Sequence, residues 1–264
     1  IRVLVDNYTD SDEVSVGHKV MIFDIEVEVT DGFPDVKEAT DKITSIAIHD
    51  SLSDTYVALV LDENKRLRLE SKDNVIIQSF EDEFSLLQNF YMKYMEIKPT
   101  IITGWNIDTF DIPYLYNRSR NIVGQNVADC LSPIRIVQWN KHRNRYMIAG
   151  VSCLDYYSLY RLFTYTQLSS YRLDAVAEHE LGENKIEYVG TLNDLYENDI
   201  DKFVEYNIHD VRLVKRMHDK LDFIDMARGV CHVGHVPYED VYFSSRYLEG
   251  AILVYLKNIG VVAP

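Results

Sequence analysis

The sequence contains little cysteine and no long hydrophobic run. Its three cysteines, Cys130, Cys153 and Cys231, stand far apart in a chain of 264 residues, which excludes a clustered zinc motif and a disulfide framework. The apolar run at residues 251–256 falls far short of the roughly 20 residues that span a membrane. No basic region followed by an apolar core opens the chain, so no secretory signal is predicted. These absences predict a soluble, intracellular protein with no membrane partner.

Positive charge is also scarce. The chain has 27 lysines and arginines against 42 aspartates and glutamates, and its formal net charge is −15. This balance argues against a protein whose main task is to grip the phosphates of a duplex, because that task needs a basic surface. It leaves open an enzyme that takes a nucleic acid end through bound cations, since such cations require acidic ligands.

The apolar and polar pattern predicts an α/β fold with a mixed sheet. Three strands, 20–29, 42–49 and 55–61, form an antiparallel meander, followed by buried strands at 100–104 and 151–154. Two further strands within 134–149 are joined by a basic turn at 141–145. Helices are predicted at 81–95, 114–120, 156–165 and 173–181, at about 199–228, and at 241–256.

The first candidate site residues lie in the first strand. Asp24 and Glu26 interrupt an apolar run two positions apart, which places both carboxylates on the same face of the strand. Two buried carboxylates repel each other unless a positive charge lies between them, and a divalent cation would supply it. A half-exposed edge strand whose acidic face meets water is the alternative, and for an isolated Asp-x-Glu it is the commoner one.

A third acidic residue, Asp111, follows the buried strand at 100–104, a position where loops often carry site residues. A helix cap is the commoner role for an aspartate just before a helix. The fourth, Asp210, lies within the long predicted helix, and Tyr206 is one turn before it on the same apolar face. A buried aspartate satisfied by an arginine or a helix terminus is the alternative for Asp210.

The four carboxylates come from a strand, a loop and a helix. At each of these places the burial of an unpaired carboxylate is energetically unfavourable. Ligands that are all oxygen suit Mg²⁺ or Mn²⁺ and disfavour zinc. Two such ions about 3.5 to 4 Å apart can activate a water and stabilise the leaving oxygen of a phosphoryl displacement. This chemistry is phosphodiester hydrolysis.

Three ordered motifs resemble the exonuclease motifs of family-B DNA polymerases, and the version in tailed bacteriophages most of all. They are Asp24-x-Glu26, Asn106-x-x-x-Phe110-Asp111 and Tyr206-x-x-x-Asp210. Flanking phrases match as well, at residues 31–34, 103–106, 173–177 and 181–185. The resemblance covers roughly residues 18 to 225.

The resemblance implies a ribonuclease-H-like fold, in which a mixed sheet is flanked by helices. It also implies that Asp24, Glu26 and Asp210 hold one Mg²⁺ or Mn²⁺. Asp24 would reach a second ion, which Asp111 would help to hold directly or through water. Tyr206 would orient the attacking water. The preceding position is Glu205, which fits the tyrosine subclass of the family and not the subclass with histidine there.

Further residues are expected to contact the DNA end. The resemblance places Phe33 as an aromatic wedge against the terminal bases, and stacking tolerates any base; anchoring of the turn in the core is the alternative. Asn106 and Phe110 are expected to shape the same pocket, and Lys185 is a candidate phosphate contact. The basic turn 141–145 is either a hairpin that helps to move a DNA end or a solvated charged turn.

These patterns predict a 3′-to-5′ exonuclease that acts on single-stranded or frayed DNA 3′ ends and releases nucleoside monophosphates, the proofreading module of a polymerase. The polymerase signature Asp-Thr-Asp and the phrase Ser-Leu-Tyr-Pro are absent, so we expect degradation and not extension. The chain begins without methionine and ends within an apolar stretch, so a piece of a longer polymerase chain is expected. The expected organisation is an edge segment, 1–17, the exonuclease domain, 18–228, and a helical extension toward a palm domain, 229–264.

Two rival functions remain at this point. One is a catalytically silent module that binds DNA or braces a polymerase. The other is a free-standing RNA exonuclease of the same superfold. Binding of Mn²⁺ and the relative activity on DNA and RNA would separate them.

Overall fold

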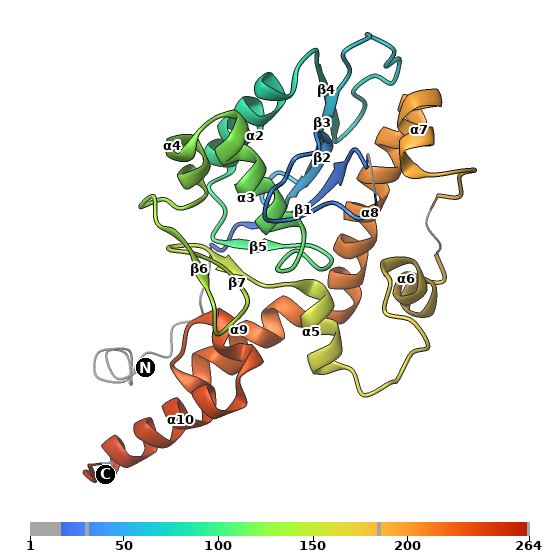
Figure 1. Cartoon of the computed structure of the whole chain (residues 1–264). Coiled ribbons are helices and arrows are strands. Elements are labelled where there is room, and N and C mark those ends of the chain that lie inside the picture. The colour runs from blue at the N-terminus through green and yellow to red at the C-terminus, as the bar shows by residue number, and fades with distance from the viewer. Residues whose placement is uncertain (1–16, 30–31, 184–185, 263–264) are drawn as a thin grey trace.

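The computed structural model describes residues 17–29, 32–183 and 186–262. A six-stranded sheet lies at its centre, in the order β4-β3-β2-β1-β5-β8 (Figure 1). Its strands are β1 (Val20–Val27), β2 (Ile43–Asp50), β3 (Thr55–Leu61), β4 (Val75–Phe80), β5 (Ile101–Thr103) and β8 (Ser152–Cys153). The pairs β1–β2 and β2–β3 are antiparallel, and the other three are parallel. The expected antiparallel meander and mixed sheet are therefore confirmed.

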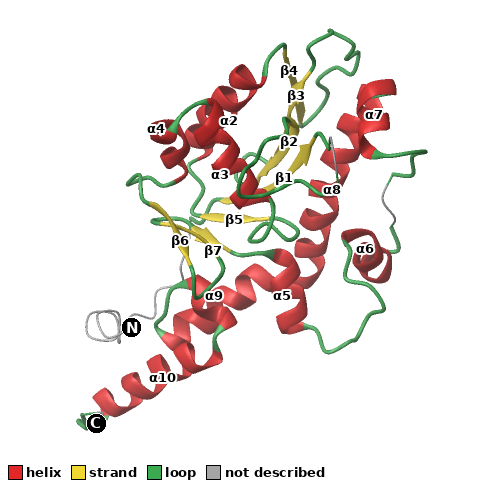
Figure 2. Ribbon diagram, viewed as in Figure 1, coloured by secondary structure: helices red, strands yellow, loops and turns green. Residues whose placement is uncertain are grey.

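Helices cover both faces of the sheet (Figure 2). One side carries α2 (Glu83–Ile97), α3 (Asp111–Ile122) and α4 (Gln125–Ala128), followed by the short 3-10 turn η1 (Asp129–Leu131). The other side carries α5 (Tyr156–Phe163), α6 (Leu173–Leu181), α7 (Leu192–Asn198), α8 (Ile200–Leu221) and α9 (Phe223–Gly234). The 3-10 turn η2 (Tyr238–Tyr242) and α10 (Ser244–Asn258) complete the described chain. This layered α/β architecture confirms the predicted fold class.

Strand β1 separates two hydrophobic cores, because its side chains alternate between the faces of the sheet. Phe23 and Ile25 pack into the core that contains α2 and α3, whereas Ile22 packs into the core that contains α8. Asp24 and Glu26 have the same parity as Ile22, so they face α8. The alternation within one strand thus decides which helix the two carboxylates meet.

The hairpin of β6 (Val137–Asn140) and β7 (Arg145–Ile148) forms a separate two-stranded sheet, as the sequence predicts. The turn does not simply point into solvent. Arg145 is 5% exposed, pairs with Asp108 at 2.6 Å, and lies over the Tyr242 ring. Arg143 pairs with Asp240 at 2.5 Å. A solvated charged turn is therefore wrong for these two arginines.

Several predicted boundaries are wrong. The first strand ends at Val27, and the helix expected from residue 114 begins at Asp111. The long helix expected to run to residue 228 is divided at Asp222, whose backbone adopts φ 55° between α8 and α9. Strand β4 and helix α7 are not predicted at all. Among the described residues, no helix is long and apolar enough to cross a bilayer.

Candidate active site

Three carboxylates from distant parts of the chain converge beside β1. Asp24 and Glu26 extend from the strand and Asp210 from α8, and one potential ligand atom from each lies within 4.8 Å of the others. Asp210 is 4% exposed and the two strand carboxylates are half-buried. Oxygen ligands at this separation fit a hard divalent cation such as Mg²⁺ or Mn²⁺. The residues can therefore hold a metal ion.

Asp111 lies beside this group without belonging to the tightest set. It is the first residue of α3 and 3% exposed, and its Oδ1 accepts a hydrogen bond from the backbone N–H of Ile25 at 3.1 Å. The cap residue of α3 is Phe110, which forms no side-chain cap, so the helix-cap interpretation of Asp111 is wrong. Burial raises the pKa of Asp111 to about 7, and the negative charges of Asp155 and Asp210 add to the effect. A nearby cation would favour its charged form.

Asn207 positions Asp24, a role that no pattern in the sequence predicts. The amide Nδ2 of Asn207 donates to Asp24 Oδ2 at 2.7 Å, and its Oδ1 accepts from the hydroxyl of Ser45 at 2.7 Å. Ser45 is directly opposite Glu26 in the β1–β2 register. Asn207 and Ser45 are both fully buried. The position of Asn207 between Tyr206 and Asp210 is the signal that could have identified it.

Tyr206 is on the inner face of α8, one turn before Asp210. It is 8% exposed, and the Tyr188 ring meets it edge-on with centroids 5.4 Å apart. Tyr206 lines the same cleft as the acidic residues. The Tyr-x-x-x-Asp spacing thus brings both side chains to one wall.

The acidic residues lie in a cleft of about 1040 Å³. Its described lining includes Asp24, Glu26, Phe33, Asn106, Phe110, Asp111, Tyr206 and Asp210. Eight of the nine residues singled out from the sequence therefore share one cavity. The ninth, Lys185, lies outside the described residues.

Phe33 is at the rim of this cleft. It is 81% exposed, so the interpretation that it anchors the turn in the core is wrong. Its ring lies 5.6 Å from that of Phe110, which in turn lies 5.5 Å from Tyr114 on α3. The exposed ring is thus supported from behind by partly buried and buried aromatic residues. Such a ring can stack on an unpaired base.

Asn106 adopts the left-handed region, with φ 67°, which asparagine tolerates better than most residues. Its backbone N–H donates to Asp155 Oδ1 at 3.0 Å, and its Oδ1 accepts from the Thr109 hydroxyl at 2.7 Å. These bonds shape the loop that leads from β5 to Asp111.

The cleft is also lined by residues that were not expected there. Among them are Trp105, Tyr157, Tyr171, Arg172, Leu173, Asp174 and Glu187. Trp105 Nε1 donates to the carbonyl of Tyr171 at 3.2 Å, and the Trp105 and Tyr157 rings meet at 5.7 Å. The phrases at 103–106 and 173–177 match the family in sequence, but no pattern predicts that both segments line one cleft.

Comparison with known proteins agrees with this geometry. Residues 3–176 match the family model described as DNA polymerase family B, exonuclease domain. The DNA-directed DNA polymerases of Escherichia phage RB69 and Enterobacteria phage T4 are each 31% identical to the chain over 93% of its length. DNA polymerase 1 of Sulfurisphaera ohwakuensis is 28% identical over 75% of it.

The chain spans 30% of the length of each of the two phage relatives and 22% of the archaeal one. The matched family model ends before α8, whereas the alignments with the phage polymerases extend over nearly all of the chain. The chain therefore belongs to DNA polymerase family B, whose exonuclease domain it contains.

Proposed function

We propose that the chain is a metal-dependent 3′-to-5′ exonuclease that removes nucleoside monophosphates from single-stranded or frayed DNA 3′ ends. The observation that carries this proposal is the convergence of Asp24, Glu26 and Asp210 within 4.8 Å in an open cleft. Its membership of the polymerase family supports DNA as the substrate. In a complete polymerase, inside the cell, the activity would serve proofreading.

Each carboxylate has a separate part in the proposal. Asp24, Glu26 and Asp210 would hold one Mg²⁺ or Mn²⁺, and Asp24 with Asp111 would hold a second. When bound, such a pair supplies an activated water and stabilises the leaving 3′ oxygen. The buried amide of Asn207 fixes the orientation of Asp24 through the hydrogen bond to Oδ2.

The proposal also assigns roles toward the substrate to four other residues of the cleft, namely Tyr206, Phe33, Asn106 and Phe110. The Tyr206 hydroxyl would orient the attacking water, and the exposed Phe33 ring would stack on a terminal base. Stacking does not depend on base identity, which suits an enzyme that must accept every 3′ end. Asn106 and Phe110 would shape the pocket for the terminal nucleotide, and Lys185 remains a candidate for a phosphate contact.

We further propose the boundaries that the sequence predicts. Residues 18–228 would form the exonuclease unit, and residues 229–264 would lead toward the rest of a polymerase chain. Residues 1–16 of the expected edge segment lie outside the described residues.

The direct test is digestion of a 5′-labelled single-stranded DNA in Mg²⁺, with EDTA and an RNA of the same sequence in parallel. We expect a ladder of shortened DNA, no digestion in EDTA, and loss of activity in Asp24→Ala. Glu205→Ala is the matched control, because Glu205 is an exposed acid on α8 that does not line the cleft. Activity in Asp24→Ala equal to that of the unsubstituted chain would refute the proposal. Equal digestion of RNA would favour the RNA exonuclease instead.

A further inference from the structure

The charge on the cleft wall is very uneven. Six of the described lining residues are acidic, namely Asp24, Glu26, Asp111, Asp174, Glu187 and Asp210. Arg172 is the only lysine or arginine among the described residues that line the cleft. A DNA strand carries a negative charge at every phosphate. The acidic walls would therefore repel every phosphate that bound metal ions do not contact.

Arg172 is exposed, and no hydrogen-bonding or ionic partner for its side chain lies among the described residues. It is the residue before α6 and is exposed. Within the described part of the chain its backbone N–H bonds to Ser170 Oγ at 3.3 Å, and its guanidinium forms no hydrogen bond or ion pair. Arg143 and Arg145 differ, because each is paired with an aspartate. Arg172 is thus available to a ligand.

The backbone that carries Arg172 is held in place by aromatic contacts. Trp105 donates to the carbonyl of the preceding residue, Tyr171. The Arg161 guanidinium lies 5.1 Å from the centre of the Tyr171 ring and donates to the Tyr157 hydroxyl at 3.1 Å. Trp105, Tyr157 and Tyr171 also line the cleft. The backbone at Arg172 is therefore held in place, and its exposed side chain can reach a ligand in the cleft.

We propose that Arg172 binds a phosphate of the single strand other than the one that is hydrolysed. This inference rests on the proposed exonuclease function and names a substrate-positioning residue for it. The planar guanidinium offers a fork of donors that matches phosphate oxygens. Arg172 directly precedes α6, whereas the convergent carboxylates belong to β1 and α8. The cleft would thus grip the strand at two separate points, through metal ions at one and through Arg172 at the other.

The test compares Arg172→Gln with the charge-matched control Arg120→Gln. Arg120 is exposed on α3 and does not line the cleft. Its guanidinium carbon Cζ lies 5.8 Å from the centre of the Tyr116 ring. Binding of a 5′-fluorescent oligo(dT) is measured by anisotropy in Ca²⁺ over a range of salt concentrations. We expect Arg172→Gln to raise Kd about fivefold to tenfold, which lies within the usual net contribution of one solvent-exposed hydrogen bond. The plot of the log of the association constant against the log of the salt concentration has a negative slope, whose magnitude should decrease by about 0.7.

The control should change Kd less than twofold and leave the salt slope unaltered, and Arg172→Lys should keep the slope while binding less tightly. In Mg²⁺, Arg172→Gln should raise KM and leave kcat unchanged, because the contact is the same in the ground and transition states. An unchanged Kd and slope, an effect equal to that of Arg120→Gln, a loss confined to kcat, or undetectable binding by the unsubstituted chain would each overturn the inference.

The two proposals can fail separately. Binding without hydrolysis by the unsubstituted chain removes the exonuclease function, while the salt slope of Arg172→Gln still decides whether Arg172 contacts a phosphate. Hydrolysis that is indifferent to Arg172 removes only the further inference.

Discussion

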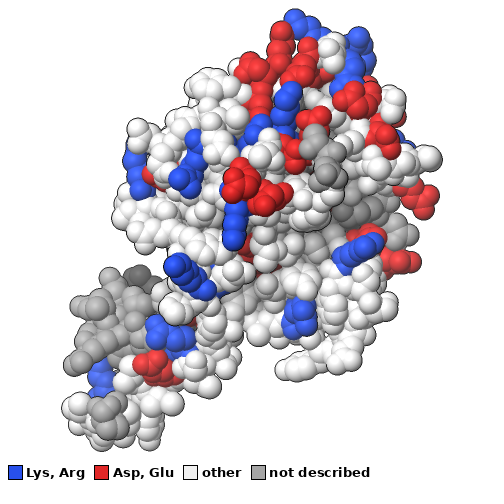
Figure 3. Space-filling view, viewed as in Figure 1, with Lys and Arg blue, Asp and Glu red and all other residues white. Residues whose placement is uncertain are grey.

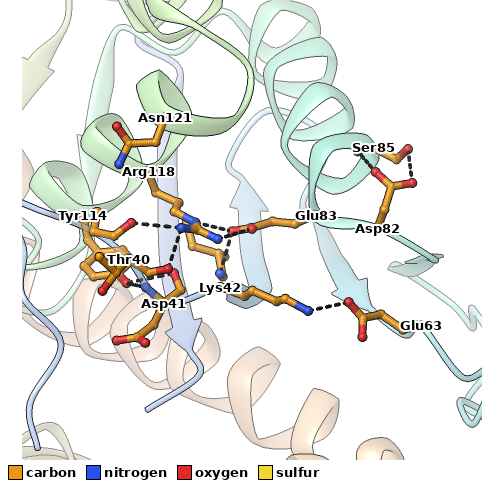
Figure 4. A network of polar contacts seen from close by, with 12 residues as sticks. Thr40, Asp41, Lys42, Glu63, Asp82, Glu83, Ser85, Tyr114, Arg118 and Asn121 are labelled. Carbon is orange, nitrogen blue, oxygen red and sulfur yellow. Dashed lines mark hydrogen bonds and ion pairs between the residues drawn. The ribbon is translucent and has the colours of Figure 1, made fainter. Parts of the chain in front are cut away.

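Helix α3 takes part in two buried charged sites of opposite design. Near its end, Arg118 donates Nε and Nη2 to the two carboxylate oxygens of Glu83, at 2.8 and 2.6 Å (Figure 4). Arg118 Nη1 also donates to the carbonyl of Thr40 at 2.7 Å. At the other end, Asp111 lies beside three convergent carboxylates. At one end of α3 a buried acid is therefore paired with an arginine, whereas at the other end several acids lie close together.

The two sites differ in how their buried charge is compensated. A buried carboxylate that holds a bidentate arginine is compensated within the fold. Convergent carboxylates lower stability through mutual repulsion and desolvation, and a bound cation would offset this loss. On the face drawn in Figure 3, acidic side chains gather in the upper part of the view, and basic side chains lie among them. Surface charge alone therefore does not distinguish the two designs, and the geometry of the partners does.

The largest effect should come from removing the internal cation. Arg118→Met leaves Glu83 buried without its partner and should lower the free energy of unfolding by about 3 to 5 kcal/mol. Urea denaturation followed by circular dichroism measures this loss. Arg120→Gln, on the same helix but exposed, is the control and should stay within about 0.5 kcal/mol. A loss no larger than that of the control would contradict the structural role of the pair.

The acidic cluster should gain stability when a cation is added, whereas the Glu83 site should lose stability when its cation is removed. Mg²⁺ or Mn²⁺ at 100 times its Kd should stabilise the chain by about 2.7 kcal/mol, seen as a rise in Tm. Asp210→Asn should remove this rise. Without metal, the same substitution should leave the stability unchanged or raise it, because it relieves repulsion among like charges. A metal-induced rise that persists in Asp210→Asn would show that the ion binds elsewhere.

Asn207 tests whether an orienting hydrogen bond is needed in addition to the carboxylates. Asn207→Ala removes the donor to Asp24 and should lower activity or metal affinity about 10- to 100-fold, the range for residues that orient a metal ligand. Ser45→Ala removes only the bond behind it and should have a smaller effect. Metal titration and single-turnover hydrolysis measure both. No loss in Asn207→Ala, or an equal loss in Ser45→Ala, would contradict a separate role for the Asn207–Asp24 hydrogen bond.

The last prediction concerns the pH dependence of stability. Asp155 is 1% exposed, and burial together with the charge of Asp108 raises its pKa to about 7. The folded chain therefore binds more protons than the unfolded one between about pH 4 and 7, so this residue makes stability fall as pH rises through that range. Asp155→Asn should flatten the fall in metal-free buffer. Parallel curves for both proteins would contradict the raised pKa.

The sequence predicted the parts of the fold that have strong periodic signals. The alternation in β1 and the Tyr206-x-x-x-Asp210 spacing led to the correct faces, because each depends only on local geometry. Strand β4 was missed, since its half-exposed residues give no core pattern. Helix α7 was missed because it is short, although the capping box of Thr191 and Asp194 was a usable signal. The division at Asp222 has no glycine or proline to mark it.

The residues of the candidate site were likewise predictable only where the sequence pattern itself was distinctive. Carboxylates at motif spacing could be identified because few structural roles explain them together. Arg172 could not, since an arginine before a helix is an ordinary surface residue until the opposite wall is known to be acidic. Asn207 needed the packing of α8 against β2, where Ser45 meets it. Contacts between segments far apart in the sequence determined what was missed.

The hydrogen bond between Asn207 and Asp24 joins residues 183 positions apart. During synthesis on the ribosome, β1 emerges many seconds before α8, at about 5 to 20 residues per second. Asp24 and Glu26 can meet the third carboxylate, that of Asp210, only after α8 has been synthesised. A nascent chain, or one truncated before α8, therefore lacks the assembled cluster, and completion of the fold itself controls when the site first exists.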